Sequence, residues 1–179
     1  MAAMWLGQYN WPRWRRALLV VSAIIGGAVL AAQTVVADSC DLSAAAKAKD
    51  EAGIKETMAA YNAALNGGQT AAVLPLYTDD GVFMPPYSES AVGKAAVKQA
   101  YDKVFDELKF HVEFAIAELV VIAPTWAYVR TNSAGTTDHH STGRTTAEAN
   151  QELFVFAKGG DGKWRIARYS FSPTKPPSQ

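Results

Sequence analysis

One candidate for a catalytic or ligand-binding side chain is a tyrosine on an apolar helix face. Tyr61 follows Ile54 and Met58 and precedes Leu65, at spacings of four, three and four residues. This periodicity predicts that the four side chains share one face of a helix, so that the phenol of Tyr61 points inward. A buried tyrosine hydroxyl needs a hydrogen-bond partner, which is either a core side chain or a ligand. Both interpretations of Tyr61 stay open at this point.

The second candidate is a carboxyl group within an apolar strand. Glu152 shares one strand face with Asn150 and Phe154, because side chains alternate between the two faces of a strand. If this face is inward, the carboxyl group must be protonated or paired, since an unpaired buried charge is costly. A protonated acid would indicate a functional role. An ion pair with Arg130 or Arg168 would be structural.

The remaining reactive residue types give weaker indications. Residues 138–140 read Asp-His-His, but adjacent histidines point to opposite sides of a strand, and the surrounding Thr, Ser and Gly are typical of a solvated loop. Cys40 is the only cysteine, which excludes an intrachain disulfide and a cysteine-based zinc site. No nucleotide-binding motif is present. We therefore expect neither a metal site nor a cofactor.

The chain has no net charge, but its basic and acidic residues are unevenly distributed. Its 179 residues include 17 Lys and Arg against 17 Asp and Glu. Residues 1–37 carry Arg13, Arg15 and Arg16 and no acid, which leaves the rest of the chain at about −3. A mildly acidic domain does not favour a nucleic-acid partner.

The N-terminal segment is typical of a targeting sequence. The three arginines precede an unbroken small and apolar run at residues 17–32, and small residues stand directly before Asp38. The run falls short of the roughly 20 residues that span a bilayer as a helix. We predict a signal peptide at residues 1–37 that is cleaved before Asp38, and export to the periplasm or the extracellular space. The alternative is an uncleaved anchor, in which case the chain contacts a membrane only through this segment.

The rest of the chain is interpreted as a lead-in at 38–47, one domain at 48–172 and a flexible tail at 173–179. Periodicity and turn residues predict helices over 45–66, 70–77 and 97–108, a turn at 79–81, and strands over 82–84, 109–122, 125–137, 146–158 and 163–172. No helix-length segment separates the last four strands. They should therefore form an antiparallel meander with the helices on one face, in an α+β fold.

Five stretches together carry a resemblance to a known family. They are residues 61–68 (YNAALNGG), 76–86 (LYTDDGVFMPP), 126–131 (WAYVRT), 152–156 (ELFVF) and 164–169 (WRIARY). This pattern resembles the SnoaL-like members of the nuclear transport factor 2 superfamily, and most closely the SgcJ/EcaC subgroup. The resemblance implies a cone, in which a curved, mainly antiparallel sheet and three helices enclose an apolar pocket, and it implies a homodimer formed through the sheet. It does not decide a reaction, because this fold hosts many.

The catalytic pattern of the ketosteroid isomerases in that superfamily is only partly matched. The resemblance places Tyr61 and Glu152 at the two positions that donate hydrogen bonds to a developing oxyanion, which requires an acid kept neutral by an apolar site. The position of the general base falls on Pro85, which cannot accept a proton. A dehydratase-type His–Asp pair is not evident either, because His111 stands on a strand of undetermined orientation. The catalytic set is therefore incomplete.

The sequence leaves three classes of function open. The preferred one is an exported SnoaL-like domain whose pocket binds a small apolar molecule. The others are an acid–base enzyme of isomerase, cyclase or dehydratase type that uses Tyr61 and Glu152, and a structural or protein-interaction domain. Residues expected to line the pocket are Phe83, Phe105, Tyr128, Arg130, Asn150, Phe154 and Arg168. Aromatic residues that alternate along a strand, such as Trp126 with Tyr128, are expected in the core.

Overall fold

The structure is a computed structural model that describes residues 44–174. Its elements are α1 (Ala44–Gly67), α2 (Thr70–Val73), the 3-10 turn η1 (Leu74–Leu76), β1 (Tyr77–Met84), β2 (Ala91–Val92), α3 (Lys94–Glu107), β3 (Leu108–Ala123), β4 (Trp126–His139), β5 (Thr145–Lys158) and β6 (Trp164–Pro173). The predicted signal peptide and its cleavage point lie outside the described residues. None of the helices within 44–174 is long and apolar enough to cross a membrane.

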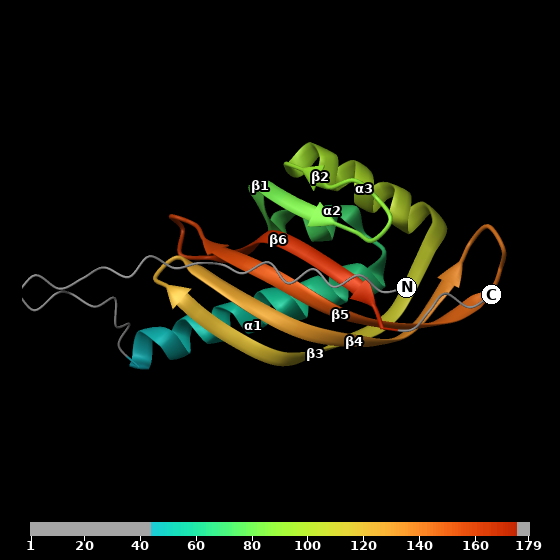
Figure 1. The fold of residues 1–179 in the computed structure, drawn as a ribbon. Helices are drawn as coiled ribbons and strands as arrows, with labels where there is room; N and C mark the ends of the chain where they lie inside the picture. Colours follow the sequence, from blue (N-terminus) through green and yellow to red (C-terminus); the bar gives the residue numbers. More distant parts are fainter. Residues whose placement is uncertain (1–43, 175–179) are drawn as a thin grey trace, which may run out of the picture. The chain divides into compact units, whose positions relative to one another are not determined.

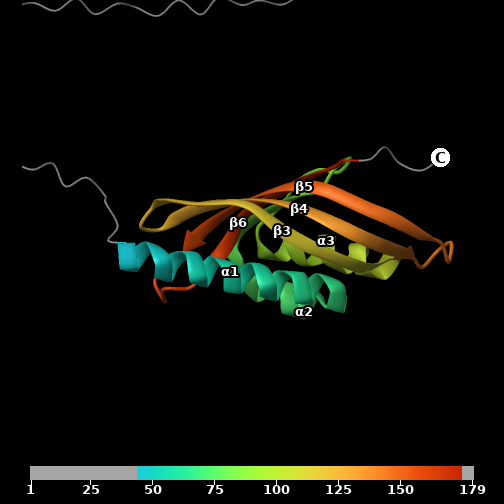
Figure 2. The same ribbon diagram turned by 90° about the horizontal axis from the view of Figure 1, so that it is seen from below.

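The strands form one curved sheet in the order β2-β1-β6-β5-β4-β3. The strands from β3 to β6 are successive antiparallel neighbours, and β1 adds to the outer edge of β6 in parallel. The four long strands run side by side in Figure 1, and Figure 2 shows the helices on one face of the sheet. The α+β fold with a mainly antiparallel curved sheet is thus confirmed.

The sheet bends where regular pairing is interrupted. The register shifts by one residue at Ala117 in β3 and at Ala167 in β6, so each strand has one extra residue there. Such bulges bend and twist a strand. At Gly135 in β4, an added Cβ would lie 2.0 Å from the carbonyl oxygen of His111, so only glycine permits this close approach of β3 and β4. These features give the sheet a concave face that the helices cover.

The core lies between α1 and the concave face. Ile54, Met58, Tyr61 and Leu65 are all buried there, which confirms the apolar helix face read from the sequence. Full burial of each such side chain contributes about 1.5–3 kcal/mol. At Gly53 an added Cβ would lie 3.2 Å from the indole of a tryptophan on β6, so this small residue allows the helix to pack closely against the sheet.

The structure differs from the sequence predictions mainly at the ends of elements. The second helix stops early, since Pro75 lies in the η1 turn and Tyr77 begins β1. The predicted turn at 79–81 is wrong, because these residues continue β1; its pairing with β6 is nevertheless irregular between Tyr77 and Val82. Helix α1 already begins within the predicted lead-in. Likewise β6 runs to Pro173, and the amide of Thr174 donates a hydrogen bond to the carbonyl oxygen of Ala149, so the start of the predicted tail is fixed to the sheet.

Candidate functional site

A cavity of about 230 Å³, partly open to solvent, lies between the helices and the concave face of the sheet. Most of its wall is aromatic or aliphatic, and its polar side chains come from β4 and β5. Its aromatic lining residues are Tyr61, Phe83, Tyr101, Phe110, Phe114, Tyr169 and Phe171, and its polar ones are Ser133, Glu148 and Asn150. An apolar hollow with a few polar groups on one side is the usual form of a small-molecule site.

Three tyrosine hydroxyls form a buried chain at this cavity. The hydroxyl oxygen of Tyr101 lies 2.7 Å from that of Tyr61 and 3.0 Å from that of Tyr77. Burial raises the pKa of all three phenols, so they stay protonated at neutral pH. Tyr61 also has a side-chain hydrogen bond with Tyr169, so a fourth tyrosine joins this chain.

The sequence predicted only one member of this chain. Tyr101 stands on the apolar stripe of α3 together with Val97 and Val104, so its inward orientation could have been read from the same periodicity that revealed Tyr61. Tyr77 gave no such signal, because it was expected to end a helix. Its hydroxyl reaches Tyr101 only because β1 begins there.

Glu152 lies on the inner face of β5 and is 3% exposed. Its carboxyl group accepts hydrogen bonds from Thr131 Oγ1 at 2.5 Å and from the Ser133 hydroxyl. Burial raises the pKa of this carboxyl group, against the opposing effect of the two hydrogen bonds. Arg130 pairs instead with Glu118 at 3.4 Å. The predicted alternative of a buried ion pair with an arginine is therefore wrong for Arg130.

Arg168 does not form an ion pair with Glu152 either. Its guanidinium lies 3.6 Å from the carboxylate of Asp80, and it lies beside Val155 of β5. The sequence placed Arg168 on the inward face because it follows Trp164 and Ile166 at even spacings. The bulge at Ala167 reverses the alternation, so that the buried side chain is Tyr169. Arg168 does not line the cavity.

A ladder of polar side chains connects Glu152 to the cavity. Asn150 Nδ2 donates to Glu148 Oε1 at 2.8 Å and, more weakly, to Ser133 Oγ at 3.4 Å. Thr137 Oγ1 donates to the other carboxylate oxygen of Glu148 at 3.0 Å. Asn150 is 7% exposed, and its Oδ1 is buried without a hydrogen-bond partner. Glu148 is the one ionisable carboxyl group among the lining residues; the sequence analysis did not single it out, although its spacing of two residues from Asn150 placed both on one strand face.

Aromatic packing supports the cavity wall. Of the apolar residues predicted for the pocket, Phe83 lines it directly. Phe154 is stacked on Tyr169 with ring centroids 4.0 Å apart, and Phe105 packs on Tyr101 at 5.6 Å. Phe105 and Phe154 thus lie behind lining residues rather than at the cavity surface. They fix the orientation of the rings that a ligand would contact.

Tyr128 and Arg130 lie on the opposite face of the sheet, contrary to prediction. Their side chains both bind Glu118, with Tyr128 Oη donating at 3.1 Å. Trp126, expected in the core, is 43% exposed on the same outer face. The inward positions of β4 are held by small residues such as Ala127 and Ser133, which leave room for α1 and the cavity. The large aromatic side chains of β4 therefore did not mark its buried face, as the sequence interpretation had assumed.

The described part of the chain shows no complete catalytic set at the cavity. Pro85, the position that the resemblance assigns to the base, does line the cavity but has no ionisable group. His111 forms a pair with Asp138, with Nε2 to Oδ2 at 3.0 Å, yet both side chains are solvent-exposed and neither lines the cavity. Within residues 44–174, no three His, Cys, Asp or Glu side chains come together as a metal site.

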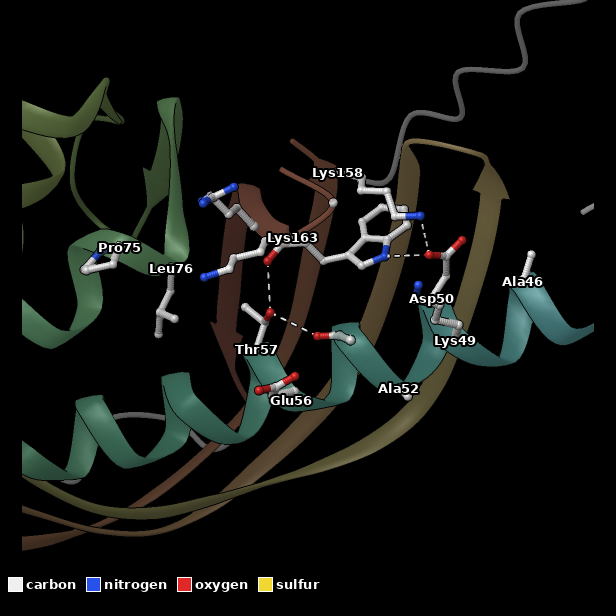
Figure 3. A pocket seen from close by; sticks show the side chains of 14 residues that line it. Ala46, Lys49, Asp50, Ala52, Glu56, Thr57, Pro75, Leu76, Lys158 and Lys163 are labelled. Carbon is white, nitrogen blue, oxygen red and sulfur yellow. Dashed lines mark hydrogen bonds and ion pairs between the residues drawn. The ribbon is translucent and has the colours of Figure 1, made fainter. Parts of the chain in front are cut away.

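A second hollow of about 870 Å³ lies between the first half of α1 and the β5–β6 hairpin. Figure 3 shows Asp50 and Lys158 joined across it, and Asp50 also accepts a hydrogen bond from Trp164 Nε1 at 3.2 Å. Thr57 Oγ1 donates to the carbonyl oxygen of Trp164 at 2.9 Å. The buried polar groups here thus bind one another and hold the helix to the hairpin. This hollow is larger, but the smaller cavity has the unmet buried group.

The fold and the cavity between helices and sheet together define a member of the nuclear transport factor 2-like superfamily. The model of the SnoaL-like domain matches residues 58–168. The chain therefore belongs to the SnoaL-like domain family. Membership of the SgcJ/EcaC subgroup stays a prediction.

Solved structures agree with this assignment. A ketosteroid isomerase-like protein from Erwinia carotovora atroseptica SCRI1043 is 39% identical, with a TM-score of 0.68 over 70% of this chain and 96% of that chain. A nuclear transport factor 2-like superfamily protein from Salmonella enterica serovar Typhimurium is 15% identical, with a TM-score of 0.65 over 74% and 96%. LinA is 11% identical, with a TM-score of 0.67 over 75% and 92%. The last two show the fold alone. No curated protein matches the chain.

Proposed function

We propose that this chain is an exported domain that binds a small, largely apolar molecule in the cavity beside Tyr61. The observation that carries the proposal is the combination of aromatic walls with a few polar side chains on one side, among them Glu148 and Asn150, whose Oδ1 is buried without a partner. A closed, fully satisfied core would leave neither the space nor the unmet group.

The missing base favours binding over catalysis. General-base catalysis typically contributes about 10² to 10⁴ in rate, and Pro85 supplies none. The relative from Erwinia is described only as ketosteroid isomerase-like, which names no substrate for this chain. Export to the periplasm or the extracellular space and pairing into a homodimer belong to the proposal on the strength of the sequence.

The proposal can be tested with 1-naphthalenemethanol, a neutral bicyclic probe, by titration calorimetry on the full-length chain. Val112→Phe enlarges a buried side chain that lines the cavity, so it should fill the space and weaken binding by more than about tenfold. Val120→Phe is the matched control, because Val120 lies opposite Tyr128 on the outer face of the same strand. Equal binding by both variants, or none by the wild type, would contradict the proposal.

A second candidate function is acid–base chemistry at the same cavity. It is favoured by one observation: the tyrosines Tyr61 and Tyr101 and the carboxyl group of Glu148 line the same space. Tyr61 would then stabilise an oxyanion, Glu152 would act on it only through Ser133 because it does not itself line the cavity, and Glu148 would take the place of the base absent at Pro85. The test follows hydrogen–deuterium exchange at the α-carbons of 2-tetralone by NMR. Exchange at the buffer rate, or unchanged in Glu148→Gln, removes this candidate.

A further inference from the structure

The polar side of the cavity is acidic and lacks a counter-charge. Glu148 lines the cavity, and Glu152 lies next to it through Ser133. Both carboxyl groups accept hydrogen bonds only from neutral donors, namely hydroxyl groups and one amide. Among the described residues that line the cavity there is no Lys, Arg or His. Glu148 is partly buried, so it presents an acidic group to the cavity with no basic side chain beside it, and a ligand cation would supply the counter-charge.

Asn150 helps to fix the carboxylate of Glu148 at the cavity wall. Its amide nitrogen donates to Glu148 Oε1, since a flipped amide would turn its oxygen towards that carboxylate. Thr137 Oγ1 donates to the other carboxylate oxygen. Asn150 Oδ1 is buried without a hydrogen-bond partner and is not accessible from the cavity, so Glu148 is the polar group that a charged ligand would meet.

The aromatic wall and the volume limit the rest of the ligand. A cavity of roughly 150 Å³ holds one benzene ring, so about 230 Å³ suits two fused rings better than a larger polycycle. Rings of Phe83, Tyr101 and Tyr169 contact one another at the cavity wall, with centroids 4.8 Å apart for the first pair and 5.6 Å for Phe83 and Tyr169. Aromatic faces attract cations as well as apolar groups.

We propose that the cavity binds a compact aromatic amine as its ammonium ion, with the ammonium group against Glu148 and the rings against the aromatic wall. This inference rests on the proposed function, because it takes the cavity to be a ligand site. It adds the charge and the size of the ligand. A cation supplies the counter-charge to the carboxylate of Glu148, and its N–H groups can donate hydrogen bonds to that carboxylate.

The test uses three probes that share the naphthalene ring and differ in charge: 1-naphthylmethylamine, 1-naphthalenemethanol and 1-naphthoic acid. Titration calorimetry on the full-length wild-type chain at neutral pH should give at least about tenfold tighter binding of the amine than of the alcohol, and weakest binding of the acid. Glu148→Gln keeps the shape of the side chain and should bring the amine to the affinity of the alcohol. Glu113→Gln is the control, because Glu113 is exposed and lies opposite Ala134 across the β3–β4 pair, away from the cavity.

The possible results separate this inference from the proposed function. If the alcohol binds as tightly as the amine in the wild type, the inference is wrong and the apolar site stands. If none of the three probes binds, both are wrong. The comparison of probes in the wild type decides the question even where Glu148→Gln does not fold. A folded Glu148→Gln that retains the preference for the amine also overturns the inference.

Discussion

The carboxyl group of Glu152 accepts a hydrogen bond from the hydroxyl of Thr131 at 2.5 Å in the interior of the domain. Its other oxygen accepts one from Ser133. Burial raises the pKa of Glu152 above that of an exposed carboxyl group, about 4.3. Between these two pKa values the folded chain holds a proton that the unfolded chain has released, so the free energy of unfolding falls as the pH rises.

We therefore expect Glu152→Gln to reduce the pH dependence of stability. The wild type should lose stability as the pH rises from about 4 through the raised pKa of Glu152. The glutamine cannot ionise and still offers an oxygen to Thr131 or Ser133, so the variant should be less sensitive over this interval. Urea unfolding at a series of pH values measures the effect, with Glu113→Gln as an exposed control. Parallel profiles for wild type and Glu152→Gln would contradict the expectation.

The helices and long strands could be predicted because local periodicity determines them. The four-three-four spacing around Tyr61 is repeated in the packed helix, and Glu152 lies inward as its neighbours Phe154 and Phe156 suggest. The position of Arg168 could not be predicted. The extra residue at Ala167 moves each later side chain of β6 to the opposite face of the sheet. The position of such a bulge depends on the curvature of the whole sheet and not on the local sequence.

The partners at the site were beyond the reach of sequence interpretation for a different reason. Glu148 and Asn150 stand two residues apart, so their shared strand face was readable, but their contacts with Thr137 and Ser133 depend on the pairing of β4 with β5. The hydroxyl contact between Tyr61 and Tyr101 spans 40 positions. Long-range contacts of this kind follow from the fold and not from local pattern.

Tyr101→Phe should destabilise the domain more than Tyr77→Phe. Tyr101 binds two hydroxyls, so its loss leaves the hydroxyl of Tyr77 unpaired and that of Tyr61 with Tyr169 alone. Loss of the Tyr77 hydroxyl leaves Tyr101 still bound to Tyr61. Each buried hydroxyl left unpaired costs about 1–3 kcal/mol. The midpoints of urea unfolding compare the two variants directly. If the midpoint of Tyr101→Phe is equal to or higher than that of Tyr77→Phe, the prediction is wrong.

The ion pair between Asp50 and Lys158, which joins α1 to the β5–β6 hairpin, should contribute more to the free energy of unfolding than an exposed ion pair does. Asp50 is buried and binds both Lys158 and Trp164 Nε1, so Asp50→Ala leaves a cation and an indole N–H without their acceptor. We expect a loss of about 2–4 kcal/mol, below the upper range for fully buried pairs because Lys158 is partly exposed. Asp161→Ala is the control, since it breaks the exposed pair with Arg165 and should cost much less stability than Asp50→Ala. Similar losses in urea unfolding would refute this ranking.

The predicted export has a direct chemical readout. If the segment 1–37 is a signal peptide, material recovered outside the cytoplasm begins at Asp38, because small residues precede that position and the apolar run is short for a span. Intact-mass measurement of the exported protein tests this. A full-length mass in the membrane fraction would support the anchor instead.

The outer face of the sheet should be the dimer interface. Trp126 and Leu153 are 43% and 47% exposed there, and Tyr128 lies opposite Val155, so the face presents apolar side chains to solvent. Pairing two such faces would bury them, and a charge at the centre would prevent it. Light scattering at micromolar concentration should show a dimer for the wild type and a monomer for Leu153→Glu. Val92→Glu, at an exposed apolar position on the edge strand β2, should remain dimeric. A monomeric wild type would exclude the dimer. A dimer that survives Leu153→Glu would place the interface elsewhere.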